Sequence, residues 1–214
     1  QPEEFYLLLL SAALGSCVLA ASSHFASLFI GLEILSISLY AMVSYSYKNA
    51  LSIEAGVKYL ILASSSAAFL LFGMALVYAQ FGSMAFANIA ANLSPTTSAD
   101  PILLVGLVMM LVGFGFKLAL VPFHLWTADV YEGAPAPVTA FIASISKGSM
   151  FAVMLRFFYP FNIIDHPSLL IVFVILAITT MLIGSLLALL QSNIKRLLAY
   201  SSIANLGYLL VAFL

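Results

Sequence analysis

Seven long apolar runs constrain the fold of this chain more than any other feature. A helix needs about 20 predominantly apolar residues to cross the hydrocarbon core of a bilayer. Runs of about this length, separated by short polar connections, lie at about 5–23, 25–46, 52–80, 101–130, 137–158, 168–191 and 193–214. We therefore predict an all-α, polytopic transmembrane helix bundle.

Charged residues are too few to cover a soluble surface. Only 7% of the 214 residues are charged and 64% are hydrophobic, whereas soluble domains carry about 25% charged residues. The formal net charge of −1 gives no indication of a nucleic-acid partner. The single cysteine, Cys17, has no disulfide partner. The sequence has no cysteine cluster, metal-spaced histidine pair or phosphate loop, so we expect no cofactor or metal in this chain.

The connections and the two ends add three expectations. Between the third and fourth runs, apolar residues recur at near-helical spacing, which predicts a short helix at about 83–93 in the membrane interface. Lys48, Lys195 and Arg196 fall on one side of the membrane and Arg156 on the other, which favours the first side as cytoplasmic. The apolar segment that ends at Leu214 leads us to expect an internal piece of a longer protein.

Two opposite charges lie in the second and third runs. Glu33 is far from either end of its predicted helix, and Lys58 follows Glu54 by four residues. Charges inside spanning helices are functional candidates by default. Lys58 has two alternatives: a local pair with Glu54 on the same helix face, or a pair with Glu33 across antiparallel helices. For Glu33 the structural alternative is a polar contact with Ser36 or a tyrosine.

Two further lysines lie farther from the ends of their predicted helices than Lys58 does. Lys117 is in the middle of the fourth run, and Lys147 is about ten residues into the fifth, or about 15 Å from its start. No acidic residue within four positions can neutralise either lysine. Burial favours the neutral amine, so these lysines could accept and pass on a proton.

The fourth run also contains helix-breaking residues around Lys117. Gly113 and Gly115 should weaken the helix, and Pro122 removes a backbone donor. Within a membrane such a break is tolerated where it packs in protein or lines a wet cavity. A break beside a buried ionisable group is typical of transporter ion sites. His124, just beyond it, is expected to be an auxiliary titratable group or a packed histidine.

Two long motifs show a family resemblance. "FKLALVPFHLWTADVYEGAPAPVTAFIASISK", residues 116–147, and "NIKRLLAYSSIANLGY", residues 193–208, resemble the signatures of the antiporter-like membrane subunits of respiratory complex I. The positions of the glutamate and the lysines are most similar to the subunit N branch of bacterial NADH-quinone oxidoreductase, the counterpart of mitochondrial subunit 2. The resemblance covers essentially the whole chain.

The resemblance implies an antiporter-like fold of about fourteen helices, built on two inverted five-helix repeats, with a broken helix that contains Lys117 and Pro122. Residues 1–160 would form the first five-helix repeat and residues 161–214 the start of the second. Glu33 and Lys58 would be the coupling ion pair. Lys117 would be the proton-carrying lysine of this half-channel, and Lys147 would link it to the second half.

The implied function is that of a proton-translocating subunit that couples quinone reduction elsewhere in the complex to proton transfer. FMN, iron–sulfur clusters and quinone would belong to partner subunits. The other partners would be sister membrane subunits and the lipid bilayer, and the location would be a bacterial inner membrane. The alternatives are a multisubunit sodium/proton antiporter, a membrane-bound hydrogenase, and a non-conducting structural scaffold.

Overall fold

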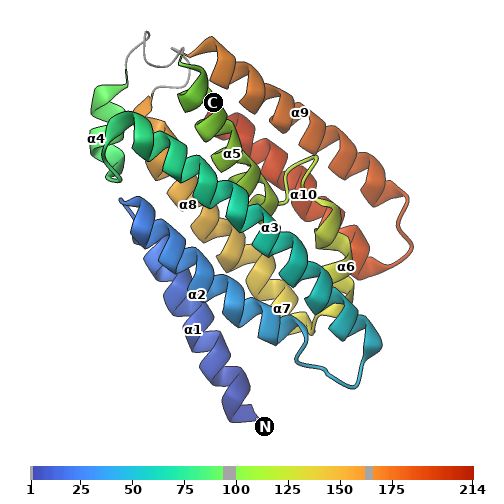
Figure 1. The fold of residues 1–214 in the computed structure, drawn as a ribbon. Helices are drawn as coiled ribbons and strands as arrows, with labels where there is room; N and C mark the ends of the chain where they lie inside the picture. The colour runs from blue at the N-terminus through green and yellow to red at the C-terminus, as the bar shows by residue number, and fades with distance from the viewer. Residues whose placement is uncertain (1, 94–99, 162–165) are drawn as a thin grey trace.

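The computed structural model describes residues 2–93, 100–161 and 166–214. Within these residues the chain is helical throughout its regular structure (Figure 1). The helices are α1 (Pro2–Ala21), α2 (Phe25–Val43), α3 (Ala50–Phe81), α4 (Phe86–Asn92), α5 (Pro101–Leu118), α6 (Leu125–Gly133), α7 (Ala136–Phe141), α8 (Lys147–Phe158), α9 (Pro167–Leu189) and α10 (Ile194–Phe213). Seven helical segments of these ranges are long and apolar enough to cross a membrane, which confirms the predicted multi-pass bundle.

Side-chain caps set several helix boundaries. Asn49, Asp100 and Asn193 each accept a hydrogen bond from the backbone N–H two residues later, at the starts of α3, α5 and α10. The expected start of α3 at Ser52 is therefore two residues late. Ser52 instead donates a 2.6 Å hydrogen bond to the Val43 carbonyl, which ties the first turn of α3 to the end of α2.

Close helix pairs form the bundle, because lipid is as apolar as a leucine side chain and association depends on tight packing. α1 packs on α2, α3 on α5, and α9 on α10 (Figure 1). A Cβ added at Gly15 of α1 would lie 2.5 Å from the Leu35 nitrogen, and one added at Gly184 of α9 would lie 2.7 Å from the Ala204 nitrogen. These backbones approach so closely only because the residues are glycines.

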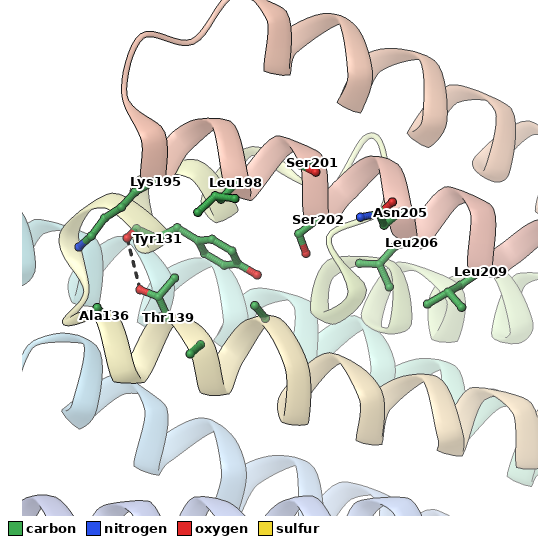
Figure 2. A pocket seen from close by; sticks show the side chains of 12 residues that line it. Tyr131, Ala136, Thr139, Lys195, Leu198, Ser201, Ser202, Asn205, Leu206 and Leu209 are labelled. Carbon is green, nitrogen blue, oxygen red and sulfur yellow. Dashed lines mark hydrogen bonds between the residues drawn. The ribbon is translucent and has the colours of Figure 1, made fainter.

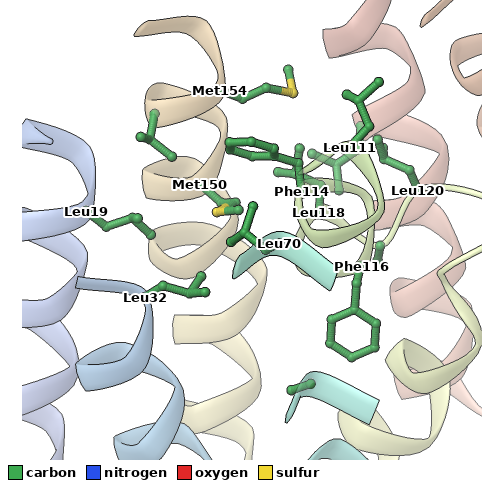
Figure 3. Close-up of a cluster of buried hydrophobic side chains, with 14 of the residues drawn as sticks. Leu19, Leu32, Leu70, Leu111, Phe114, Phe116, Leu118, Leu120, Met150 and Met154 are labelled. Atoms are coloured by element: carbon green, nitrogen blue, oxygen red, sulfur yellow. The ribbon is translucent and has the colours of Figure 1, made fainter. Parts of the chain in front are cut away.

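A buried apolar cluster lies where five helices meet. Figure 3 shows Leu19, Leu32, Leu70, Phe114 and Met150, which come from α1, α2, α3, α5 and α8 and are each at most 1% exposed. This cluster fixes α5 against its neighbours on the side that precedes the predicted break.

The predicted interfacial helix is present as α4. Its Phe86 and Ile89 are buried, and the Phe86 ring packs against Phe25 and Phe157, with centroids 5.8 and 5.2 Å apart. Its place in the membrane interface stays a prediction. The assignment of residues 1–160 and 161–214 to two inverted repeats also stays a prediction.

Candidate functional site

The fourth run is broken, as its sequence predicts. α5 ends at Leu118, Ala119 adopts a left-handed conformation with φ of 60°, and α6 begins at Leu125. The turn between them contains Pro122, whose peptide bond to Val121 is cis. The run therefore forms two helices joined by irregular backbone.

Side chains satisfy the backbone groups that the break exposes. Trp126 Nε1 donates to the Phe116 carbonyl at 3.0 Å, and Thr180 Oγ1 of α9 accepts from the Val121 N–H at 3.0 Å. Both contacts are buried, so the break is held in protein rather than exposed to lipid.

Gly113 and Gly115, which precede Lys117, do not weaken the helix as expected. Gly113 and Gly115 both lie inside regular α5. A Cβ at Gly113 would meet Leu70 at 2.6 Å, and one at Gly115 would meet the Phe123 ring at 2.8 Å. They therefore admit neighbouring side chains, and Gly115 lets the turn fold back onto α5.

Lys117 is buried next to the break with only hydroxyl and aromatic partners. Its side chain reaches α2 and α3, where Nζ donates to Ser36 Oγ at 2.7 Å and to Tyr59 Oη at 3.3 Å. Nζ also lies 5.2 Å from the centroid of the Tyr59 ring. The residue is 4% exposed. No carboxylate of the described residues forms an ion pair with it.

Glu33 approaches this lysine from α2. Glu33, Ser36 and Tyr40 share one face of α2, and the Glu33 charge interacts electrostatically with both Lys117 and Tyr40. Within the described part of the chain Glu33 forms no ion pair. The structure therefore does not pair Glu33 with Lys58, and the Glu33 charge acts on Lys117 only at a distance.

Lys58 belongs to a charged network at one end of the bundle. It pairs with Glu54 at 2.7 Å, the local alternative considered above, and with Asp129 of α6 at 2.9 Å. Arg196 of α10 pairs with Asp129 at 2.8 Å and with Glu132 at 2.9 Å. The Lys58 side chain is 44% exposed. We call Glu54, Lys58, Asp129, Glu132 and Arg196 the end network.

Asp129 is the shared member of this network and lies outside the seven candidate spans. Burial works against its ionisation, but hydrogen bonds from Lys58 and Arg196 outweigh that effect and hold the pKa of the carboxyl below its usual value. Asp129 therefore remains an anion between two cations.

Lys147 is as deeply buried as Lys117 but lies on the opposite side of α6 from it. It is the first residue of α8, directly after a π-helical turn at Ile142–Ser146, an irregularity often found at functional sites. Nζ donates to Ser202 Oγ of α10 at 2.9 Å and lies 5.4 Å from the Tyr131 ring centroid. Lys147 is 2% exposed. It too lacks a carboxylate partner among the residues described.

His124 lies at the start of α6 and is 6% exposed. Its ring is near the Pro122 backbone, yet neither ring nitrogen has a partner at hydrogen-bonding geometry. The ring approaches Tyr200 of α10 edge-on, with centroids 6.5 Å apart. The predicted auxiliary residue is thus on the α10 side of the break, away from the Ser36 and Tyr59 partners of Lys117.

Sequence reasoning did not identify the neutral partners of the two lysines or the acceptors in the end network. Ser36 precedes Lys117 by 81 positions and Ser202 follows Lys147 by 55. Asp129 does carry a readable signal in the sequence, because it lies three residues before Glu132 and so on the same face of one helix.

Comparisons with known proteins agree with this fold. The model of a family described as NADH:quinone oxidoreductase/Mrp antiporter, TM, matches residues 22–214. A chain of respiratory complex I from Thermus thermophilus with bound aureothin is similar at a TM-score of 0.85 and 41% identity, over 98% of this chain and 45% of that one.

Two further structures share the fold. A chain of an archaeal membrane-bound sulfane sulfur reductase aligns at a TM-score of 0.85 and 32% identity, over 98% of this chain and 42% of that one. A chain of the Mrp complex from Dietzia sp. aligns at 0.85 and 23% identity, over 96% and 38%. The chain thus spans less than half the length of these proteins. It belongs to the transmembrane family of NADH:quinone oxidoreductase and Mrp antiporter subunits.

Proposed function

We propose that this chain is part of a proton-translocating membrane subunit of an NADH-quinone oxidoreductase, of the subunit N type. The observation that carries the proposal is a pair of buried lysines, one beside the helix break and one directly after the π-helical turn. Lys117 and Lys147 are each held by a serine hydroxyl and a tyrosine ring rather than by a fixed counter-charge. A hydroxyl both donates and accepts, so it can stabilise the amine in either protonation state.

The 41% identity to a chain of respiratory complex I over 98% of this chain favours this function over its alternatives. The similarity to the Mrp complex is 23% and supports the fold alone. Partner subunits would supply FMN, iron–sulfur clusters and quinone, and sister antiporter-like subunits would adjoin this one in a bacterial inner membrane.

The effect of quinone reduction would be transmitted to Lys117 through the charged residues of α2 and α3. Glu33 acts on Lys117 across the bundle interior, while Lys58 is shared between Glu54 and Asp129. A rearrangement that moved Lys58 between carboxylates would change the field at Glu33 and hence the proton affinity of Lys117. Lys147 would exchange its proton on the α10 side.

Proton pumping by the assembled complex that contains full-length Lys117→Ala tests this function. We expect pumping to fall by about tenfold or more, because a positioned proton carrier commonly contributes at least that factor. Lys48→Ala is the matched control, since Lys48 lies in the exposed α2–α3 connection. Wild-type pumping by Lys117→Ala and Lys147→Ala would favour the scaffold alternative.

The subunits that copurify with the full-length protein separate the remaining alternatives. Flavin- and iron–sulfur-containing partners that oxidise NADH support the proposal. Copurification with antiporter or hydrogenase subunits alone would overturn it.

A further inference from the structure

Four helices in the described part of the chain begin with a side-chain cap, and the cap of α2 differs from the others. Asn49, Asp100 and Asn193 cap α3, α5 and α10, and amide or carboxylate oxygens accept hydrogen bonds throughout the neutral pH range. α2 is capped by a histidine, whose Nδ1 accepts from the Ala26 N–H at 3.2 Å. Only the neutral ring can do this, because both nitrogens of a charged imidazole are donors. The cap of α2 therefore depends on the protonation state of His24.

The His24 ring is open to protons from outside the bundle. His24 is exposed and lies between the first two candidate spans, in the connection at 22–24 that we call the α1–α2 corner. The corner is at the same end of the bundle as Arg156, which donates to the Ala21 carbonyl at 2.9 Å. More basic residues lie at the opposite end, with the end network, which favours that end as cytoplasmic. We therefore expect the corner to face the side that receives protons in the proposed function.

Backbone hydrogen bonds join the same corner to the segment that begins α4. The Phe25 N–H donates to the Met84 carbonyl at 3.0 Å. The Ser23 carbonyl accepts from the Phe86 N–H at 2.9 Å. These two bonds flank His24, so the residue lies where α1, α2 and α4 meet. A change in the charge of its ring therefore acts on a junction of three helices.

No acidic group of the described residues pairs with the His24 ring. α2 has no acidic residue in its first turn, and a positive charge at a helix N-terminus opposes the helix dipole. The charged and titratable groups at this end form no hydrogen bond or ion pair with the ring; they are Arg156, Tyr159, Tyr78, Asp100 and His166. Protonation therefore breaks the cap without supplying another bond in its place.

The α1–α2 corner is separate from the groups that would carry protons. Lys147 donates to Ser202 of α10, and Figure 2 shows Ser202 among the residues that line a cavity of about 550 Å³, to which no residue of the corner contributes. Ser36, which accepts from Lys117, is twelve residues beyond His24 on α2, or about 18 Å along the helix. A substitution of His24 therefore leaves the proton-carrying residues in place.

We propose that the α1–α2 corner is a pH-sensitive switch, in which protonation of His24 removes the cap of α2 and loosens the first turn of that helix. The cap is present above the pH range in which imidazole titrates and is lost as the pH falls through that range, about 8 to 5. The use of the switch rests on the proposed function: protons that accumulate on the receiving side loosen α2, which carries Glu33 and Ser36, and slow further transfer. The loosening itself does not depend on that function.

Amide hydrogen exchange in the full-length protein within its complex measures the loosening. After correction for the intrinsic effect of pH on exchange, amides at 25–30 should open at least about threefold more often at about pH 5 than at about pH 8, because an N-cap bond is lost. His24→Asn supplies an acceptor that does not titrate, so it should remove this difference. An equal difference in the wild type and in His24→Asn would overturn the proposal.

His166→Asn is the matched control for this substitution. His166 also precedes a helix, α9, but its side chain makes no cap bond. The control should keep the wild-type pH dependence at 25–30, and its loss there would show that the effect does not come from the cap of α2, which would overturn the proposal. His24→Ala lacks the cap at every pH, so its amides at 25–30 should open at about pH 8 at least as often as those of the wild type at about pH 5.

Proton pumping against an acidified receiving side tests the use of the switch. His24→Asn should pump like the wild type at neutral pH and should lose at least about twofold less activity when that side is acidified. If exchange shows the loosening but both proteins lose pumping equally, the regulatory use is overturned. If Lys117→Ala and Lys147→Ala pump like the wild type while exchange shows the loosening, the proposed function fails and the switch in α2 stands.

Discussion

At the scale of single residues, the buried lysines show how a membrane protein can stabilise a buried amine without fixing its protonation state. Lys117 has one short hydrogen bond, at 2.7 Å to Ser36, and one longer bond, at 3.3 Å to Tyr59. A carboxylate at the same place would hold the ammonium strongly and oppose release of its proton. A neutral hydroxyl lowers the cost of burial and leaves both protonation states accessible.

Ser36→Ala should therefore slow proton transfer while the fold is kept. The change leaves the Lys117 ammonium with Tyr59 alone, and we expect pumping to fall about three- to tenfold, the equivalent of about 1 kcal/mol for a lost hydrogen bond. Pumping by the assembled complex is the measurement.

Ser38→Ala is the matched control for this change. Ser38 is also buried on α2 and also donates to its own helix, at 2.8 Å to the Ile34 carbonyl, but Lys117 does not donate to it. Equal effects of the two changes would show that Ser36 matters only for packing.

At the scale of elements, the break between α5 and α6 is stabilised by a hydrogen bond with another helix, α9. The turn supplies a free N–H at Val121, and Thr180 from the next helix pair satisfies it. Gly115 leaves room for the Phe123 ring, which brings the turn back onto α5. The broken element therefore depends on a residue nearly sixty positions away.

Thr180→Val should destabilise the bundle by about 1–3 kcal/mol, because it leaves a buried N–H without an acceptor while side-chain shape is kept. Thermal unfolding of the purified full-length protein in detergent measures the change. Thr179→Val is the neighbouring control, since its hydroxyl bonds carbonyls of its own helix. A Thr180→Val protein as stable as the control would contradict the assigned contact.

At the scale of the whole molecule, the end network joins three helices that are distant in sequence. Asp129 of α6 binds Lys58 of α3 and Arg196 of α10. Lys195 adds hydrogen bonds to the Glu132 and Ala134 carbonyls, where α6 ends. Arg156 is at the opposite end of the bundle, where it donates to the Ala21 carbonyl. Most of these basic residues therefore lie at the end of the bundle where the end network joins the helices, and only Arg156 of those named here lies at the other end.

Asp129→Asn should lower the unfolding midpoint more than Glu54→Gln does. Asp129 holds two cations and its loss should cost about 1 kcal/mol, whereas Glu54 makes an exposed pair within one helix, worth a few tenths of that amount. Thermal unfolding of full-length variants in detergent compares them, and equal shifts would mean that the network does not join the helices.

The pH dependence of this contribution has a defined sign. The pKa of Asp129 is held below its usual value, so the stabilisation is present above the pKa of the unfolded chain and is lost only as pH falls through the lowered folded value. The difference between wild type and Asp129→Asn should therefore stay constant across neutral pH.

Much of the architecture could be predicted from local sequence. Runs of apolar residues locate the seven spans, because a bilayer accepts only helices whose backbone groups are satisfied internally. Pro122 and the residues around it predict the broken helix, since proline cannot donate within a helix. The buried positions of Lys117 and Lys147 follow from their distance to any polar segment.

The partners of those residues could not be predicted in the same way. Whether Lys58 pairs with Glu54, Glu33 or Asp129 depends on how α6 lies across α3. Gly133 sets this approach, because a Cβ there would lie 2.5 Å from the Leu51 carbonyl oxygen. The sequence by itself determined that Lys117 and Lys147 are buried and that the fourth run is broken after Lys117. Only the tertiary structure decided which groups meet, because hydrogen bonds and ion pairs act over a few ångströms between helices that are distant in sequence.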